Sequence, residues 1–184
     1  MLPPFLGPLN PLGYPAPYWF IQFFKVFGFT LHMALMNLWF AGLITMLLLR
    51  WRGGAHARRL SDRVINAMPF VVAFGINLGI VPLLFTQVAY YQVFYSATIL
   101  AAWPWFAVVP LLLVAYYGIY LYVIGLRQGT LTPLKRAAGW ISAGIFMLLG
   151  LVFSNTFSLM TNVAGWRPLW NATSQTGAPY GIGL

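Results

Sequence analysis

Four long runs of apolar residues, almost free of charge, decide what this chain can fold into. Of its 184 residues, 61% are hydrophobic and only 6% are charged. A soluble domain carries about a quarter charged residues, so this chain cannot cover a globular surface with polar groups. In lipid, a helix of about 20 residues satisfies its own backbone hydrogen bonds while it crosses the bilayer. The sequence therefore predicts an all-α polytopic membrane protein with a four-helix transmembrane bundle.

The expected organisation is an arm, a membrane domain and a tail. Residues 1–18 contain six prolines and no charge, which is typical of an extended arm lying on the outer surface of the bundle or on a partner subunit. The membrane domain is expected over residues 19–161 and the outer tail over 162–184. Within this domain, the spans are predicted at about residues 19–49, 64–86, 106–126 and 137–161, with a basic linker over 53–63 and a Tyr- and Trp-rich interfacial stretch over 87–105.

The distribution of basic residues predicts the orientation of the chain. The net charge is +9, with five arginines after the first span and three basic residues after the third, whereas only Lys25 and Arg167 lie elsewhere. Loops rich in Lys and Arg stay in the cytoplasm, so both basic loops are expected there and both termini outside. The expected location is the bacterial inner (cytoplasmic) membrane, crossed several times by the chain. The pattern of basic residues does not resemble a groove for nucleic acid, and no nucleic-acid partner is expected.

The near absence of acidic residues and the absence of cysteine exclude several kinds of chemistry. Asp62 is the only acidic residue of the chain, and there is no cysteine. Paired-carboxylate hydrolysis and carboxylate metal cages require at least two acidic groups. Disulfides, thiolate metal sites and thioether-linked haem all require cysteine. The chain is therefore not expected to be an enzyme on its own.

His32 is the one ionisable side chain expected inside the membrane, which makes it the leading candidate for a functional residue. It precedes Arg50 by 18 residues, or about 27 Å of helix, which places it near the outer edge of a core about 30 Å thick. Met36 and Trp39 share its face of the helix. The imidazole could ligate haem iron or chlorophyll magnesium, bind a quinone carbonyl, face a partner subunit, or simply bond a neighbouring helix.

Other polar and small residues of the spans complete the set of candidates. A second axial ligand would be a methionine of this chain or a residue of another subunit. Gln87 follows Pro82 at the outer membrane border, beside tyrosines, where its amide could bind a quinone head group. The remaining amides are expected to bond across helices, and the glycines to permit close helix approach. The methionines are Met33, Met147 and Met160; the amides are Asn37, Asn77, Asn155 and Asn162; the glycines are Gly75, Gly79, Gly139, Gly144 and Gly150.

Three segments in order resemble the first four helices of subunit I of cytochrome bd quinol oxidases. They are Leu31-His32 early in the first span, the run FGINLGIVPLLFTQVAYYQVFYS from Phe74, and Ser154-Asn155 followed by NVAGW at residues 162–166. The resemblance covers roughly residues 19–170. It implies that His32 ligates a haem b on the outer side of the membrane, in a complex that handles quinone.

The chain also departs from that family. Leu83 and Leu84 stand where the family has a glutamate, and the third span has none of the family's glutamates. The family's later helices, which supply the low-spin haem ligands and the quinol-binding loop, have no counterpart in these residues. Oxygen reduction by this chain alone is therefore not expected.

The function predicted from the sequence is that of an integral membrane subunit of a respiratory or photosynthetic electron-transfer complex. His32 would bind a haem b, or help Gln87 form a quinone site, near the outer face. Its partners would be other membrane subunits, membrane lipid and a periplasmic redox protein that exchanges electrons with the quinone. One alternative is a cofactor-free anchor that holds partners in the membrane; another is a transporter or channel, which the scarcity of charge in the spans disfavours.

Overall fold

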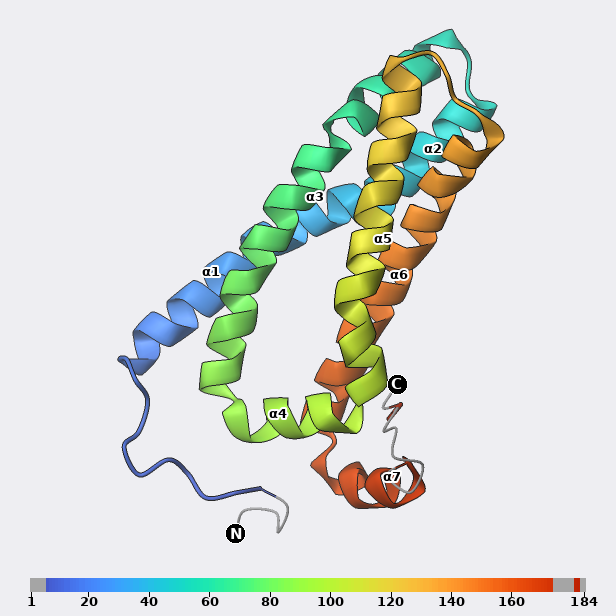
Figure 1. Cartoon of the computed structure of the whole chain (residues 1–184). Coiled ribbons are helices and arrows are strands. Elements are labelled where there is room, and N and C mark those ends of the chain that lie inside the picture. The colour runs from blue at the N-terminus through green and yellow to red at the C-terminus, as the bar shows by residue number, and fades with distance from the viewer. Residues whose placement is uncertain (1–5, 174–180, 183–184) are drawn as a thin grey trace. The chain divides into compact units, whose positions relative to one another are not determined.

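The computed structural model describes residues 6–173 and 181–182, and these residues form helices without any strand. Four helical segments are long and apolar enough to cross a membrane (Figure 1). The prediction of an all-α, four-span membrane protein is confirmed. The four segments are Tyr18–Arg52, Ala55–Ala89 (α3), Ala102–Arg127 (α5) and Pro133–Thr161 (α6).

The first segment is not a uniform α-helix. It consists of α1 (Tyr18–Asn37), a five-residue π-helix η1 (Leu38–Gly42) and α2 (Leu43–Arg52). At 35 residues it is longer than the roughly 20 that a bilayer requires, as expected from the sequence. Short π-helical turns inside α-helices occur often at functional sites, because they change which side chains face a neighbouring helix.

The basic linker expected over residues 53–63 is almost entirely helical, and this prediction was wrong. α2 ends where the Gly53 amide donates to the Leu49 carbonyl at 2.8 Å, and α3 already begins at Ala55. The three arginines of this stretch therefore lie in the first turns of α3. Arginine is a good helix former, so its charge marks a membrane border without ending the helix.

Three short elements complete the described fold. α4 (Tyr91–Leu100) occupies the stretch expected at the membrane interface and runs crosswise between the end of α3 and the start of α5 (Figure 1). The 3₁₀ turn η2 (Val163–Gly165) follows α6 and leads into α7 (Trp166–Thr173). The Asn162 side chain caps η2 by accepting from the Gly165 amide at 3.3 Å.

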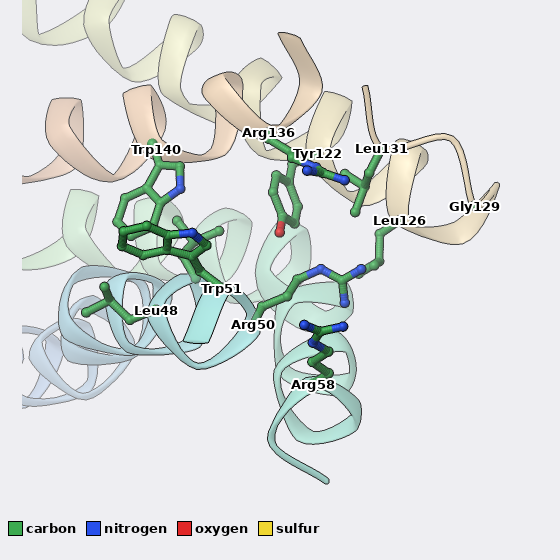
Figure 2. Close-up of a pocket in the computed structure, with 11 residues that line it drawn as sticks. Leu48, Arg50, Trp51, Arg58, Tyr122, Leu126, Gly129, Leu131, Arg136 and Trp140 are labelled. Atoms are coloured by element: carbon green, nitrogen blue, oxygen red, sulfur yellow. The ribbon is translucent and has the colours of Figure 1, made fainter. Parts of the chain in front are cut away.

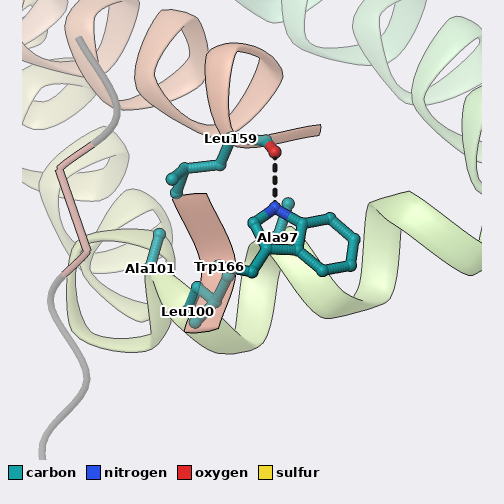
Figure 3. Packing of buried hydrophobic residues seen from close by; sticks show 5 residues of the cluster. All are labelled: Ala97, Leu100, Ala101, Leu159 and Trp166. Carbon is teal, nitrogen blue, oxygen red and sulfur yellow. Dashed lines mark hydrogen bonds between the residues drawn. The ribbon is translucent and has the colours of Figure 1, made fainter. Parts of the chain in front are cut away.

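The chain divides into two compact units, to which each of the four long segments contributes. Unit 1 contains residues 1–28, 80–108 and 150–184, and unit 2 contains residues 29–79 and 109–149. In unit 1, Trp166 lies in a cluster with Ala97, Leu100, Ala101 and Leu159 (Figure 3). The Trp166 indole Nε1 donates to the Leu159 carbonyl at 2.7 Å, so the ring is both buried and hydrogen-bonded.

The proline-rich arm contacts the other segments of unit 1. The Asn10 amide donates to the Tyr91 hydroxyl at 2.7 Å, and the Tyr14 hydroxyl donates to the Ala89 carbonyl at 3.4 Å. The described part of the arm therefore lies against the corner between α3 and α4.

Unit 2 is held together by apolar packing and by the single carboxylate of the chain. Leu43 and Leu47 of α2 and Ile65 and Met68 of α3 are almost completely buried. Asp62 on α3 forms an ion pair with Arg50 on α2. On their outer surfaces the long helices expose large apolar side chains, including Phe70, Phe74, Phe106 and Leu113. An apolar exterior of this extent is what contact with lipid requires.

Candidate functional site around His32

His32 lies on α1 and is fixed by a hydrogen bond to α3. Its ring nitrogen Nδ1 is 2.8 Å from the main-chain carbonyl oxygen of Gly75. A carbonyl oxygen can only accept, so Nδ1 must carry the proton in this arrangement. In the neutral ring, the other nitrogen, Nε2, presents a lone pair, which is the form that binds a metal or accepts a hydrogen bond.

Gly79 creates the space that the imidazole ring occupies. A Cβ atom at this position would lie 2.7 Å from Cε1 and 2.8 Å from Nδ1 of His32, closer than real Cβ atoms come to other groups. Gly75 and Gly79 are four residues apart on α3 and so share one face of that helix. The prediction that these two glycines permit close helix approach is confirmed.

Trp39, in η1, forms the second side of the His32 site. Its ring is 7% exposed and lies edge-on to the His32 ring, with 5.9 Å between centroids. It also stacks on Phe146 of α6 at 5.5 Å, and it contacts Gly75 so closely that any side chain there would clash with it. The shared helix face of His32 and Trp39 was predicted; Phe146 was not, because nothing in its local sequence indicates a contact with α1.

Nε2 of His32 remains accessible from outside the chain. Among the described residues, no buried side-chain nitrogen or oxygen lacks a hydrogen-bond partner, and Nε2 has no partner. This nitrogen is therefore not sealed within the fold. A histidine that donates Nδ1–H to a main-chain carbonyl while Nε2 stays open has the arrangement typical of histidine metal ligands.

The described residues contain no group of three His, Cys, Asp or Glu side chains that could hold a metal ion. A haem needs no such group, because its porphyrin supplies four ligands and the protein supplies one or two axial ones. The Nδ1 bond and the accessible Nε2 thus fit a histidine that would hold a haem iron. Met160, a methionine considered for the opposite position, packs against the unit 1 cluster instead, a common role for this residue.

Gln87 belongs to unit 1, near the end of α3. Its side chain is half-buried, and within the described part of the chain its amide has no hydrogen-bond partner. Three residues further on, Tyr90 accepts a hydrogen bond from Lys25 Nζ at 2.8 Å. This bond, with a smaller contribution from Gln22, lowers the pKa of Tyr90 below the usual tyrosine value.

Two of the amides expected to bond across helices do not do so. Asn37 donates to the Met33 carbonyl and Asn77 to the Ala73 carbonyl, both at 2.8 Å, so each bonds one turn back along its own helix. Both side chains are exposed on the surface of apolar helices. Asn155, in contrast, is buried and donates to the Gly181 carbonyl at 2.9 Å, which joins α6 to the tail rather than to another helix.

No family model matches the chain, and neither a curated protein nor a solved structure is similar to it at a significant level.

Proposed function

We propose that this chain is a membrane subunit of an electron-transfer complex and that His32 holds a haem b through Nε2. One observation carries the proposal: Nδ1 is bonded to the Gly75 carbonyl while Nε2 is accessible and unpartnered. The Nδ1 bond would fix the ring orientation and increase the basicity of Nε2. When bound, a haem would supply one-electron transfer, and this chain would position it through the His32 ring, which packs against Trp39.

The exposed amides favour a role as one subunit among several. Asn37 and Asn77 each use one amide proton within their own helix, so the amide oxygen and a second proton stay unpaired among the described residues. Polar groups on a lipid-facing surface are costly, and they usually face another helix. A partner membrane subunit over these two positions would satisfy both amides. We also propose a periplasmic redox protein as a second partner, which would exchange electrons with the quinone.

The haem assignment is tested by measuring haem b per chain in purified variants. His32→Ala should lose the bound haem because it removes the only proposed ligand of this chain. His56→Ala is the matched control, because His56 is the other histidine and bonds Arg59 on α3. Equal haem content in wild type and His32→Ala would reject the assignment.

A quinone site that includes Gln87 is the second part of the proposal. Its unpartnered amide, half-buried and three residues before Tyr90 in the chain, is suited to donate a hydrogen bond to a quinone carbonyl. Gln87→Leu should reduce the quinone that co-purifies with the protein, whereas Gln128→Leu, in an exposed turn, should not. Unchanged quinone retention in Gln87→Leu would remove this residue from the site.

The competing function is a cofactor-free anchor, and one observation favours it specifically. The His32 ring is already hydrogen-bonded to α3 and packed against Gly79 and Trp39 without any added group. In that case the wild type would purify without haem or quinone, and His32→Ala would weaken only the pairing of α1 with α3.

A further inference from the structure

A basic cavity in unit 2 is separate from the His32 site. It has a volume of about 960 Å³, and α2, α3 and α6 each place an arginine in its wall: Arg50, Arg58 and Arg136. Figure 2 shows the side chains of Arg50 and Arg58 extending into the same region, with Arg136 and Tyr122 on its opposite side.

The charge of this cavity is not balanced within the chain. Its three guanidinium groups carry +3, and the one carboxylate side chain, Asp62, pairs with Arg50, which leaves +2. Arg58 and Arg136 form no side-chain hydrogen bond or ion pair with the described residues. Arginines that line one cavity attract an anion with several oxygens, above all a phosphate, because the guanidinium group can donate two parallel hydrogen bonds to it.

The remainder of the cavity wall is apolar. Leu48 and the indole rings of Trp51 and Trp140 line it beside the arginines, and all three side chains are exposed. The site therefore offers charge and apolar surface together. A free anion would contact only the charged groups. A lipid with a phosphate head group and acyl chains would contact both the charged groups and the apolar surface.

Tyr122 gives the cavity a buried, closely packed wall. Its side chain is 5% exposed, and its hydroxyl points toward Arg50 (Figure 2). The ring lies against Gly139 on α6, where a Cβ atom would come within 2.5 Å of the ring carbon Cδ2. Close approach of α5 and α6 at Gly139 thus holds this wall in place.

We infer that this cavity binds an anionic phospholipid, with Arg58 and Arg136 on the phosphate and with Leu48, Trp51 and Trp140 against the apolar part. The site lies at an end of membrane-spanning helices, where lipid phosphates are abundant. It is independent of the haem proposal, because no residue is common to the two sites.

The test is native mass spectrometry of the purified full chain with lipids of identical acyl chains. The wild type should retain phosphatidylglycerol in preference to phosphatidylcholine. The double variant Arg58→Gln/Arg136→Gln should weaken phosphatidylglycerol binding about thirtyfold, given the usual contribution of each basic residue to anionic lipid binding. Phosphatidylcholine binding should weaken less, because the choline group offsets the charge of its phosphate. Arg59→Gln/Arg63→Gln removes the same charge from α3 outside the cavity and should keep the preference.

Three results would overturn the inference. The first is equal retention of the two lipids by the wild type, a result that needs no variant and no assumption about folding. The second is an equal loss in both double variants, which would indicate general surface charge. The third is displacement of phosphatidylglycerol by inorganic phosphate at equal concentration, which would indicate a soluble phosphate ligand.

Discussion

At the scale of single residues, the two nitrogens of His32 have different roles. Nδ1 is hydrogen-bonded to the Gly75 carbonyl, and this bond links α1 to α3. Nε2 is free, and only this atom distinguishes a cofactor ligand from a structural histidine. Both functions depend on Gly79, because the ring occupies the space that a side chain at that position would fill.

We expect Gly79→Ala to displace the His32 ring and break its bond to Gly75. A Cβ atom would lie 2.7 Å from Cε1 of His32, so either the ring or the helix must move. The expected loss is about 1–3 kcal/mol of unfolding free energy, from overpacking and the lost hydrogen bond. Thermal unfolding of the detergent-solubilised protein measures it.

Gly144→Ala is the control for that experiment. Gly144 lies within α6 with no atom near its missing side chain, so close helix approach, which was expected there, does not occur. Alanine should be neutral or stabilising by up to about 1 kcal/mol, because it favours the helix more than glycine does. A similar destabilisation by both variants would refute the steric role of Gly79.

Tyr90 should give the protein a measurable pH dependence in alkaline solution. The hydrogen bond from Lys25 lowers its pKa below 10.0, because it favours the phenolate over the phenol. A group with a lowered folded-state pKa contributes stability that is complete above its unfolded pKa and is lost as the pH falls through the folded value. The stabilising contribution should therefore rise with pH up to 10.0.

Ultraviolet titration of wild type against Tyr90→Phe isolates the tyrosinate signal of Tyr90. Lys25→Met should return the pKa of Tyr90 toward 10.0, whereas Lys135→Met, which alters a lysine bonded to Thr130 instead, should not change it. An unchanged Tyr90 titration in Lys25→Met would contradict the assigned cause.

At the scale of elements, the π-helix η1 adds an aromatic contact to those that α1 and α2 make in unit 2. It carries Trp39, which packs on Gly75 and stacks on Phe146. We expect Trp39→Ala to cost about 3–5 kcal/mol, as for other buried aromatic truncations. Trp19→Ala, at a site 70% exposed, should cost less than about 1 kcal/mol. Equal destabilisation by Trp39→Ala and Trp19→Ala in thermal unfolding would contradict a stabilising role for the packing of Trp39.

Hydropathy predicted the four spans because long apolar runs are a local property of sequence. The helix ends were less predictable: α3 begins nine residues before the expected position, since arginines at 58, 59 and 63 mark the membrane border and still favour helix. The η1 turn, the Phe146 contact and the gathering of arginines around one cavity depend on which helices become neighbours. No local pattern determines that, so these features could not be predicted.

At the scale of the whole molecule, the orientation in the membrane is a prediction from the basic residues. The chain has no cysteine, so one introduced cysteine is the only site for a thiol reagent. With a membrane-impermeant maleimide, Leu12→Cys should react in spheroplasts, and Gly54→Cys should react only in inverted vesicles. Both positions are open, with Leu12 90% exposed and no atom within 4 Å of a Cβ at Gly54. The reverse pattern would place the termini inside.

The reduced-minus-oxidised absorption spectrum of the purified protein tests the central claim most directly, with imidazole rescue as its key step. The account predicts a haem b band in the wild type, loss of that band in His32→Gly, and its return when free imidazole is added to the variant in the presence of haem. A wild-type protein without a haem band, or a band unchanged in His32→Gly, would contradict the claim that Nε2 of His32 holds a haem b.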